Sequence, residues 1–558
     1  MVKVVKKLKK GIRTFSSGTS SVETSPYRPK NVEKLAPCMD TCPNQTNIRG
    51  ILTTIALSEK HGRTYEESFS TAWDLLIKNN PYPSVCGRVC PHPCESACNR
   101  LEKDGALAIN NVERFIGDYA LKNKLTFAKP AQKYSEKIAI IGSGPAGMSC
   151  AFQLAKLGYP VTVFEAFPKL GGMLRYGIPA YRLPREILDA ETQRILDLGV
   201  EVRTNTIVGK DIPYSELQKE YKTIFVGIGA HQGKKLGVPG EDADNLWTGT
   251  AFLNGINSGQ SVDVGNHVVV VGGGDTAIDA ARVSRRLGAK ATILYRRTRQ
   301  EMPAIDEEIV GAEEEGVDLV YLAAPIEIIR SNGKAIGMVC QRMELGEPDS
   351  SGRRRPVPIE GSTYNLECST IIAAISQEPD FVGVENLREG RDWIKVDEFG
   401  HTKVEGIYAG GDALELGLVT IAIYQGRRAA ETIHRELRGL PYTPEEKQEI
   451  IKHDRLLLSY FEEKLRHEAL KMDPQARLAD ADAEIASTLT EKEVIDEALR
   501  CMSCGSCFDC GQCWSYCQDG AIKKPLIKGE PYTYKMEFCN GCKKCAEQCP
   551  CGYIEMHL

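Results

Sequence analysis

The sequence predicts an α/β protein with two Rossmann-like dinucleotide-binding domains, flanked by a cysteine-rich domain at each end. Two glycine-rich turns follow short apolar strands, within 138–147 and 267–277. The alternation of strand, glycine turn and helix from 137 onward is typical of a parallel sheet. Seventeen of the twenty cysteines lie outside this region, six of them within 38–98 and eleven within 501–551. A chain of 558 residues exceeds what one hydrophobic core usually organises, so we expect several domains.

Composition excludes several classes of protein. The net charge of −5 gives no support to nucleic-acid binding. No apolar run approaches the roughly 18 residues of a membrane helix, and the basic N-terminus lacks the apolar segment of a secretory signal. We therefore expect a cytoplasmic protein. Clustered cysteines in a large chain of this kind indicate metal rather than a disulfide framework.

The first glycine-rich turn reads Gly-Ser-Gly-Pro-Ala-Gly and begins at Gly142. Gly142 permits a tight turn, Gly144 lets the backbone approach a pyrophosphate, and Gly147 lets the following helix pack against the strand. The helix N-terminus supplies free N–H groups for phosphate. The next strand ends at Glu165, which is placed to accept hydrogen bonds from a ribose. These parts together predict a dinucleotide site rather than an unrelated glycine turn.

The second turn reads Gly-Gly-Gly-Asp-Thr-Ala over 272–277, and the fingerprint allows alanine in the place of its third glycine. The next strand ends in Arg296 and Arg297 instead of an acid. Guanidinium groups at this position suit a 2′-phosphate, through paired and charged hydrogen bonds. We therefore predict NADP(H) rather than NAD(H). The alternative is that these arginines only line a solvated turn.

The C-terminal cysteines form two runs of the bacterial-ferredoxin spacing, C-x2-C-x2-C-x3-C. In two-cluster ferredoxins the fourth cysteine of each run ligates the other cluster. We therefore expect one [4Fe–4S] cluster on Cys507, Cys510, Cys513 and Cys549, and a second on Cys539, Cys542, Cys545 and Cys517. Zinc is disfavoured because zinc sites usually present separated cysteine pairs. Cys501, Cys504 and Cys551 stay unassigned, and free thiols are the simplest interpretation.

The N-terminal cysteines show a spacing of four over 86–98, which would align them on one helix face. Pro91 and Pro93 forbid a regular helix there, so a loop wrapped around a cluster fits better. Zinc or structural cysteines are the alternative.

The motifs resemble one family of flavoproteins over 31–440. It contains the small subunit of bacterial glutamate synthase, the large subunit of the NADH-dependent ferredoxin:NADP oxidoreductase and the N-terminal half of dihydropyrimidine dehydrogenase. The resemblance rests on GSGPAG, GGMLRYGIP, VGIGA, GGGDTA, YRRTRQEMPA and AGGDA, which begin at 142, 171, 226, 272, 295 and 409.

The resemblance implies a glutathione-reductase-like pair of domains, in which the NADP(H) domain is inserted into a split FAD domain. It implies that the flavin lies near 171–173 and Asp412, and that a helix following Thr420 caps it. The implied FAD-binding residues are Gly142, Gly144, Pro145, Ala146, Gly147, Glu165, Gly171, Gly172, Met173, Gly229, Gly411, Asp412 and Thr420. The implied NADP-binding residues are Gly272, Gly273, Gly274, Asp275, Thr276, Arg296 and Arg297.

The family also carries one or two [4Fe–4S] clusters in the N-terminal domain. By the match to dihydropyrimidine dehydrogenase, Cys42, Cys90 and Cys94 would share a cluster, with Glu113 as a non-cysteine fourth ligand. Three further candidates for a second cluster, or for supporting thiols, are Cys38, Cys86 and Cys98. This chain lacks the CxxC pair that the family carries upstream.

These patterns divide the chain into seven segments. They are a flexible basic tail (1–30), a helical iron–sulfur domain (31–130), the first part of the FAD domain (131–235), the NADP(H) domain (236–376), the second part of the FAD domain (377–440), a helical connector (441–500) and an α+β 2[4Fe–4S] ferredoxin domain (501–558).

The parts predict an enzyme of anaerobic metabolism that exchanges a hydride between NADP(H) and FAD and passes single electrons through [4Fe–4S] clusters. Because this chemistry needs placement rather than proton transfer, we assign no catalytic side chain. The chain has no recognisable domain for another substrate. We therefore expect a subunit of a larger redox complex, with ferredoxin or an NADH-oxidising flavin and iron–sulfur subunit as partner. An electron-bifurcating or confurcating transhydrogenase complex is one version.

Three alternatives remain open. The chain could donate electrons to a glutamate synthase, or to another reductase, for example one for an aromatic acyl-CoA or a 2-oxoacid. A different class is a non-catalytic wiring scaffold, against which the intact glycines and the two arginines argue.

Overall fold

The computed structural model describes residues 25–350, 352–390, 393–442 and 448–558. The first parallel sheet has the strand order β18-β5-β2-β3-β4. Its central strand β2 (Ile138–Ile141) and its neighbours β3 (Val161–Phe164) and β5 (Thr223–Val226) are buried along their whole length. Such continuous apolar runs are what a parallel strand covered on both faces requires. The outer strands are β4 (Glu201–Arg203) and β18 (Ile407–Ala409).

Two helices cover one face of this sheet, and they pack against each other. Helix α8 (Pro145–Leu157) follows the first glycine turn, and α15 (Val419–Leu437) follows β18. Pro145 stands in the first turn of α8, where its missing N–H has no intrahelical role. Between β3 and β5 the chain forms α9 (Met173–Tyr176), α10 (Arg185–Leu196) and α11 (Tyr214–Glu220).

The second parallel sheet has the order β10-β9-β8-β14-β7 and is inserted into the first domain. The chain enters through β6 (Gln232–Gly233) and leaves through β15 (Gln377–Glu378), and these two short strands pair with each other. The predicted α/β class with two dinucleotide-type sheets is therefore confirmed. The strands are β7 (Leu246–Thr248), β8 (His267–Val271), β9 (Lys290–Tyr295), β10 (Asp318–Tyr321) and β14 (Thr370–Ala373), and the helices are α12 (Gly249–Asn257), α13 (Asp275–Arg286) and α14 (Asp306–Glu314).

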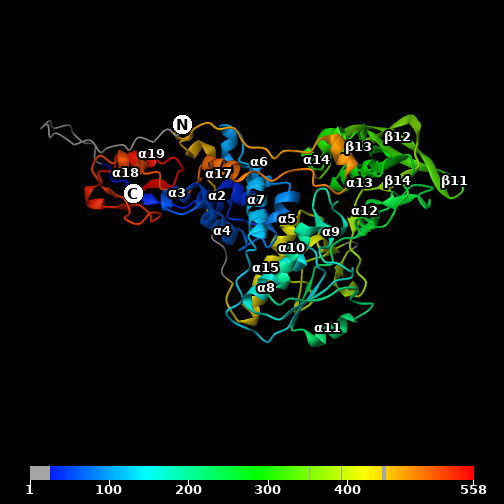
Figure 1. Cartoon of the computed structure of the whole chain (residues 1–558), viewed down its shortest axis with the longest axis horizontal. Coiled ribbons are helices and arrows are strands. Elements are labelled where there is room, and N and C mark those ends of the chain that lie inside the picture. Colours follow the sequence, from blue (N-terminus) through cyan, green and yellow to red (C-terminus); the bar gives the residue numbers. More distant parts are fainter. Residues whose placement is uncertain (1–24, 351, 391–392, 443–447) are drawn as a thin grey trace.

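An antiparallel three-stranded sheet lies at the far end of this inserted domain (Figure 1). It is formed by β11 (Ala323–Ser331), β12 (Lys334–Pro348) and β13 (Arg354–Glu367).

The N-terminal domain is helical, as predicted. Its longer helices are α2 (Ile48–Ala56), α4 (Tyr65–Leu76), α5 (Pro83–Val89) and α7 (Ile109–Lys122), and its short ones are α1 (Pro37–Thr41), α3 (Ser58–His61) and α6 (Pro93–Ser96). Helix α5 ends at Cys90, and α6 starts only at Pro93, so the prolines interrupt the helix as expected.

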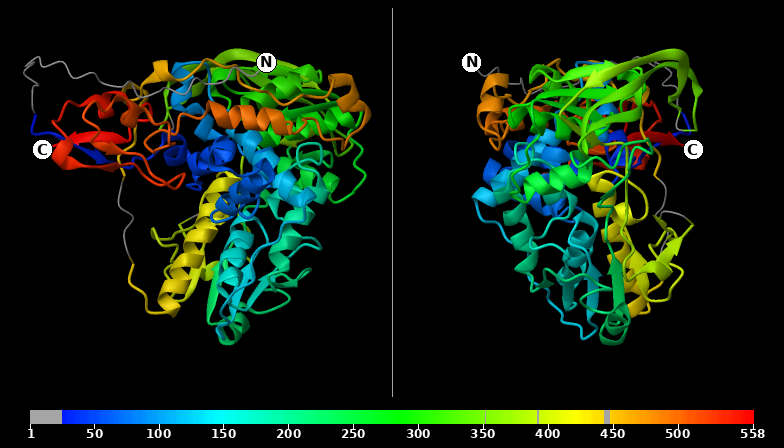
Figure 2. Two further views of the ribbon diagram at one scale, coloured as in Figure 1. Left: turned by 60° about the vertical axis from the view of Figure 1, so that its left-hand side comes forward. Right: turned by 90° about the vertical axis from the view of Figure 1, so that its right-hand side faces the viewer.

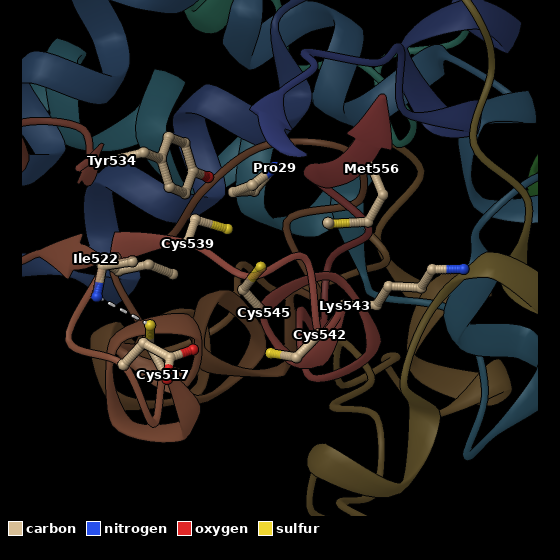
Figure 3. Close-up of a pocket in the computed structure, with 11 residues that line it drawn as sticks. Pro29, Cys517, Ile522, Tyr534, Cys539, Cys542, Lys543, Cys545 and Met556 are labelled. Carbon is tan, nitrogen blue, oxygen red and sulfur yellow. Dashed lines mark hydrogen bonds between the residues drawn. The ribbon is translucent and has the colours of Figure 1, made fainter. Parts of the chain in front are cut away.

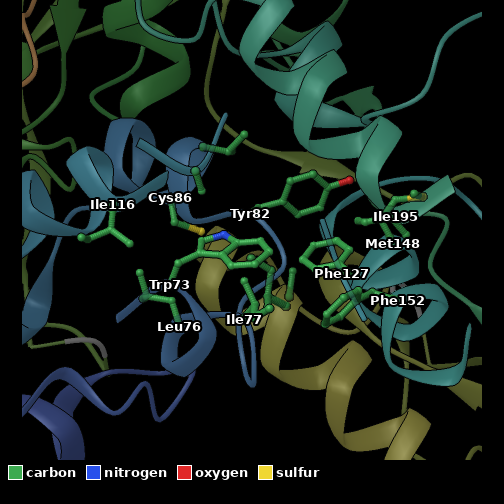
Figure 4. Packing of buried hydrophobic residues seen from close by; sticks show 14 of the residues in the cluster. Trp73, Leu76, Ile77, Tyr82, Cys86, Ile116, Phe127, Met148, Phe152 and Ile195 are labelled. Carbon is green, nitrogen blue, oxygen red and sulfur yellow. The ribbon is translucent and has the colours of Figure 1, made fainter. Parts of the chain in front are cut away.

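The N-terminal domain and the first sheet share one hydrophobic core (Figure 4). Trp73 of α4 stacks on Phe127 at 5.7 Å between ring centroids, and Phe127 contacts Phe152 of α8 at 4.6 Å. In addition, the buried carboxylate of Glu191 in α10 accepts the amides of Ser84 and Val85, both at 2.9 Å. The start of α5 is thereby fixed to the flavin-type domain.

The segment 441–500 differs from the predicted helical connector. Among its described residues only α16 (Pro474–Ala479) and α17 (Glu491–Arg500) are α-helices. The rest crosses the surface of the molecule in irregular form (Figure 2). Charged, helix-favouring residues do not form stable helices where no apolar face packs on a core. Helix α17 does have such a face, and it packs against α2 and α7.

The two ends of the chain meet. Strand β1 (Arg28–Asn31) pairs antiparallel with the last strand, β21 (Ile554–His557). Residues 28–30 were predicted to belong to a flexible tail, and that prediction is wrong for them because they complete this ladder; 1–24 lie outside the described residues. The other elements of the C-terminal domain are α18 (Gln512–Tyr516), β19 (Ile522–Lys523), β20 (Thr533–Tyr534) and α19 (Lys544–Glu547).

No helix in the described part of the chain has the length and apolar character needed to cross a membrane.

Candidate functional site

A cavity of about 440 Å³ lies at the carboxyl ends of the first parallel sheet, where ligands of such sheets bind. Its walls include Ile141 at the end of β2 and Phe164 at the end of β3. The start of α8 and the start of α15 close it from one side, through Pro145 and Val419.

The glycines of the first turn have separate roles. Gly142 has φ +97°, and a Cβ there would lie 2.3 Å from the carbonyl oxygen of Gly227. A Cβ on Gly147 would lie 2.0 Å from the carbonyl oxygen of Gly142, so this glycine lets helix and turn touch. A Cβ on Gly144 would meet no atom of the chain within 4 Å, and Gly144 lines the cavity. The turn therefore leaves open the space that a pyrophosphate needs.

Glu165 is buried at the cavity wall and organises the turn. Its carboxylate accepts the Ser143 amide at 2.9 Å, the Ser143 hydroxyl at 2.5 Å and the Phe167 amide at 2.8 Å. The Ser143 hydroxyl in turn accepts the Gly171 amide at 3.0 Å. A carboxylate has about four acceptor positions, so one stays available for a ribose hydroxyl.

Most of the remaining predicted flavin residues also line the cavity, namely Pro145, Ala146, Gly172, Met173, Gly229, Gly411 and Asp412. Gly147, Gly171 and Thr420 are not among the residues that line it. Two lining residues that the sequence did not reveal are Phe167 and His231, whose rings lie 5.5 Å apart. Burial lowers the pKa of His231 below its usual value, which favours a neutral ring. Neither residue belongs to a motif that could have identified it.

A second cavity of about 740 Å³ lies at the carboxyl ends of the inserted sheet. All seven predicted nicotinamide-site residues line it, from Gly272 to Arg297. A Cβ on Gly273 would lie 2.5 Å from the ring of Tyr295, whereas a Cβ on Gly274 would meet only a Pro303 carbon at 3.9 Å. The Asp275 carboxylate accepts the amide of Ile305 at 3.0 Å, which anchors the loop beside the cavity.

The two predicted arginines of this cavity differ in their surroundings. Arg296 is exposed at its edge. Arg297 is 5% exposed and donates to the Asp349 carboxylate and to the carbonyl of Arg354, both at 2.7 Å. Arg353 also lines the cavity, and no motif had singled it out. The candidates for a 2′-phosphate are therefore Arg296 and Arg353, while Arg297 holds the β12–β13 hairpin.

The two cavities meet. Asp412, Gly417 and Leu418 line both of them. The Gly417 amide donates to the Asp412 carboxylate at 3.1 Å, and burial raises the pKa of Asp412 to about 6. A group bound in one cavity can therefore reach a group bound in the other.

Three thiols and one carboxyl group lie within electrostatic reach of one another, and we call them the flavin-side group: Cys42, Cys90, Cys94 and Glu113. Burial raises the pKa of Cys90 to about 12, and the charges of Glu113 and Cys42 add to the rise. Burial raises the pKa of Glu113 to about 7, and its carboxylate accepts a hydrogen bond from the side-chain amide of Asn80 at 2.8 Å.

The flavin-side group adjoins the first cavity. The Thr420 hydroxyl, in the first turn of α15, lies beside the Cys90 thiol and lowers its pKa. Val419 and Ala422 of the same helix line the cavity. One helical turn thus separates the cavity from the cysteines.

Cys86, predicted as a candidate ligand, is fully buried in the shared core with Trp73 and Ile116 (Figure 4). Cys38 and Cys98, the other two candidates, line a separate cavity together with Cys501 and Cys504.

The C-terminal domain brings its two predicted sets together. The outer ferredoxin group, Cys517, Cys539, Cys542 and Cys545, lines one pocket (Figure 3). The inner ferredoxin group is Cys507, Cys510, Cys513 and Cys549. Burial raises the pKa of Cys510 to about 11, and the charges of Cys549 and Cys507 add to it.

Within the described residues, no three His, Cys, Asp or Glu side chains are placed to hold one metal ion. The ligands of a cubane cluster need not converge on one ion, because its four cysteines bind four different iron atoms.

Comparison of the sequence with known proteins identifies the family. Residues 136–426, more than half of the chain, match the family of pyridine nucleotide-disulphide oxidoreductases. The chain belongs to this family. Residues 31–125 match a second family, the 4Fe-4S cluster domain II of dihydropyrimidine dehydrogenase. The protein is therefore a pyridine-nucleotide-dependent flavin oxidoreductase with an iron–sulfur domain, as predicted.

Three relatives within the family are similar over long stretches. The NADPH-Fe(3+) oxidoreductase subunit beta of Geobacter sulfurreducens is 37% identical over 544 residues, covering 88% of this chain and 79% of that protein. The NADP(+)-dependent formate dehydrogenase subunit beta of Moorella thermoacetica is 40% identical, over 74% of this chain and 62% of that protein. The small chain of glutamate synthase [NADPH] of Escherichia coli is 36% identical, over 67% of this chain and 83% of that protein.

Proposed function

We propose that this chain is the NADP(H)-reacting subunit of a multi-subunit redox complex, and that it carries electrons from the nicotinamide site through FAD to its C-terminal cysteines. The observation that carries the proposal is the position of the first cavity. It shares Asp412, Gly417 and Leu418 with the nicotinamide-type cavity, and it adjoins Cys90 through the first turn of α15.

The chemistry requires a bound flavin, which accepts two electrons as a hydride and releases them singly. In balance, NADPH and two oxidised clusters give NADP⁺, one proton and two clusters reduced by one electron each. The residues of the chain supply placement. Gly144 and Gly274 leave room for the two pyrophosphates, Glu165 fixes the turn and faces a ribose, and Arg296 meets the 2′-phosphate. No side chain needs to act as a general acid or base.

Three [4Fe–4S] clusters follow from the cysteine groups. We assign one each to the flavin-side group, the inner ferredoxin group and the outer ferredoxin group. Cysteine thiolates are the usual ligands of such clusters, and each of these groups collects its thiols from separate turns; only Cys507 and Cys542 among them are exposed. In the flavin-side group, Glu113 stands as the fourth ligand beside three cysteines.

The exit to a partner lies at the outer ferredoxin group. The loop that connects β19 and β20 exposes Leu526 by 95% and Ile527 by 70%, and Phe538, next to Cys539, is 54% exposed. Exposed apolar side chains in a redox domain favour a docking surface. The relatives named as beta subunits support a partner subunit as its occupant.

A bifurcating or confurcating complex is the more specific version of the proposal. It requires a second flavin and an NADH site, which a partner would supply. We therefore expect the isolated chain to react with one pyridine nucleotide only. Transfer among NADPH, NADH and ferredoxin by the isolated chain would contradict this version.

The likeness to the glutamate synthase small chain favours one second candidate, electron donation to an amidotransferase partner. Glutamate formation from 2-oxoglutarate and glutamine with such a partner would establish it. The C-terminal ferredoxin domain lies outside residues 136–426, which match the family model. It favours electron exit through iron–sulfur clusters instead.

The proposal is tested by anaerobic titration of the purified holoprotein with NADPH and, separately, with NADH. We expect NADPH to bleach the flavin absorbance and then the iron–sulfur absorbance, and NADH to act at least tenfold more slowly. Faster bleaching by NADH would overturn the assignment of Arg296. No response to either nucleotide would return the chain to the class of wiring scaffolds.

A further inference from the structure

Four cysteines from opposite ends of the sequence line one cavity, and we call them the junction group: Cys38, Cys98, Cys501 and Cys504. Cys38 lies in α1, and Cys98 precedes the short turn at Asn99–Glu102. Cys501 caps the C-terminus of α17, and Cys504 follows it by three residues. Apolar side chains, among them Leu52 and Met502, supply much of the remaining wall.

The thiols of this group lie within electrostatic reach of one another. Burial raises the pKa of Cys38 well above its usual value, and the charges of Cys501, Cys98 and Cys504 raise it further. Arg49 acts in the opposite direction on the same thiol. A cluster with four thiolate ligands carries net negative charge, and Arg49 supplies a cation beside it.

The backbone at 501–505 has the conformation of the two ferredoxin turns. In 507–511, Asp509 has φ +56° and Gly511 has φ +80°. In 539–543, the matching residues Gly541 and Lys543 have φ +74° and +63°. In 501–505, Ser503 has φ +48° and Gly505 has φ +76°. All three turns are C-x-x-C, with left-handed backbone before and after the second cysteine.

The match includes hydrogen bonds to sulfur. The Ser503 amide donates to the Cys501 sulfur at 3.4 Å, as the Asp509 amide does to the Cys507 sulfur at 3.4 Å. Left-handed backbone is uncommon for residues other than glycine, so its appearance at Ser503 reflects a constraint. Amides that donate to sulfur stabilise the thiolate form and tune cluster potentials.

Buried polar contacts hold the two halves of the group together. Arg49 of α2, only 9% exposed, donates to the carbonyls of Lys34 at 2.6 Å and Cys504 at 2.7 Å. Arg500 of α17, 1% exposed, donates to the carbonyl of Ala106 at 3.1 Å. The carboxylate of Glu497, also in α17, accepts the Ala108 amide at 2.9 Å. The cavity is therefore built by specific docking of the C-terminal segment onto the N-terminal domain.

We propose that Cys38, Cys98, Cys501 and Cys504 hold a further [4Fe–4S] cluster, with two ligands from each end of the chain. Cys501 and Cys504 take the place of the CxxC pair that is missing upstream of Cys38. The cluster deepens the proposed function, because it stands between the flavin-side group and the ferredoxin domain, but its presence does not depend on reaction with NADPH.

The sequence spacing fixes its place in the order of groups. Cys38 and Cys98 are each four residues from a member of the flavin-side group, namely Cys42 and Cys94. Cys504 is three residues from Cys507 of the inner ferredoxin group. Four residues of extended chain reach at most roughly 14 Å, so the junction cluster is the link between its two neighbours.

The test compares two double variants that each remove two buried or half-buried thiols. Cys501→Ala with Cys504→Ala removes half of the junction group, whereas Cys340→Ala with Cys368→Ala removes two thiols from the inserted domain. We expect the first to lose about four iron atoms per chain and the second to lose none. The EPR spectrum of the dithionite-reduced protein should lose one cluster signal in the first only. Flavin bleaching by NADPH should persist in both, which separates this inference from the proposed function.

Unchanged iron in the first variant would overturn the proposal, and so would one zinc ion per chain in the wild type. If the variant does not fold, native mass spectrometry of the wild-type holoprotein decides. Four cubane clusters per chain are expected, and three would contradict the junction cluster.

Discussion

The nucleotide cavities and the junction group are built in opposite ways. Each cavity takes its essential turn from one continuous strand–turn–helix segment, as at Gly142–Gly147. The junction group takes its members from Cys38 to Cys504, and these meet only after α17 docks on the N-terminal domain. The nucleotide sites are therefore encoded locally, whereas the electron path depends on long-range docking. Substitutions can therefore disable one system while the other stays intact.

The sharpest separation should come from Gly144→Val. A side chain at this position projects into the first cavity without meeting the fold, so we expect flavin content to fall more than tenfold at unchanged iron content. Gly274→Val is the matched control, because Gly274 caps α13 as Gly144 caps α8. It should keep flavin and lose reduction by NADPH. Loss of iron in Gly144→Val would break the comparison.

Substitution of a docking contact should affect the C-terminal cysteine-rich domain and leave the nucleotide-binding domains unchanged. Lys34 is fully buried and binds the Gly552 carbonyl at 2.8 Å and the Glu555 carboxylate at 3.0 Å. Lys34→Met removes the buried cation of this pair, whereas Glu555 is partly exposed and keeps its ion pair with Arg455, so we expect a loss below the about 3–5 kcal/mol of a fully buried pair. We expect faster hydrogen exchange in β21, with β2 unchanged.

The control for this contact is Lys137→Met, because the Lys137–Glu220 pair is exposed on both sides. An exposed pair contributes about 0–1 kcal/mol, so exchange in β21 should stay at the wild-type rate. Equal effects of the two variants would show that Lys34 does not hold the chain ends together.

The two arginines of the second cavity separate binding from stability. Arg296→Ala should raise the KM for NADPH about 10- to 100-fold, the scale of a charged hydrogen bond of about 1.5–3 kcal/mol, and leave the KM for NADH unchanged. Arg297→Ala should lower the melting temperature instead, because Arg297 is buried against Asp349. A loss of NADPH affinity without a loss of stability in Arg297→Ala would reverse these roles.

The smallest effect concerns Asp412, which joins the two cavities. Burial raises its folded-state pKa to about 6, above the ordinary value of 3.8, so ionisation favours the unfolded chain. The loss of stability caused by ionising Asp412 is absent below pH 4, grows between pH 4 and 6 and is complete above pH 6. In the flavin-free Gly144→Val background, Asp412→Asn should therefore stabilise the protein by up to about 3 kcal/mol at pH 8 and hardly at pH 4. Equal stabilisation at both pH values would refute the pKa argument.

The sequence could predict the locally encoded elements of the fold but not the contacts that depend on tertiary docking. The strand before Gly142, the helix to Leu157 and the break at Pro91 depend on local patterns, and the structure has them as predicted. The charged, helix-favouring pattern of 441–500 carries no information on packing, and most of its described part is irregular. The spacing around Cys501 could not reveal its partners, because Cys38 reaches it only through tertiary docking.

The pairing of Arg297 with Asp349 escaped prediction for the same reason. Asp349 lies near the end of the β12–β13 hairpin, and nothing near Arg297 in the sequence indicates that the hairpin folds back to it.

Electrons from the nicotinamide site should reach the C-terminal domain through the junction group. Stopped-flow reduction by NADPH, followed by rapid-freeze EPR, tests this path directly in the wild type and in the variant with Cys501→Ala and Cys504→Ala. We predict the same rate of flavin reduction in both, with the ferredoxin-domain signals appearing in the wild type and delayed at least a hundredfold in the variant. Equally fast reduction of those clusters in the variant would contradict the account.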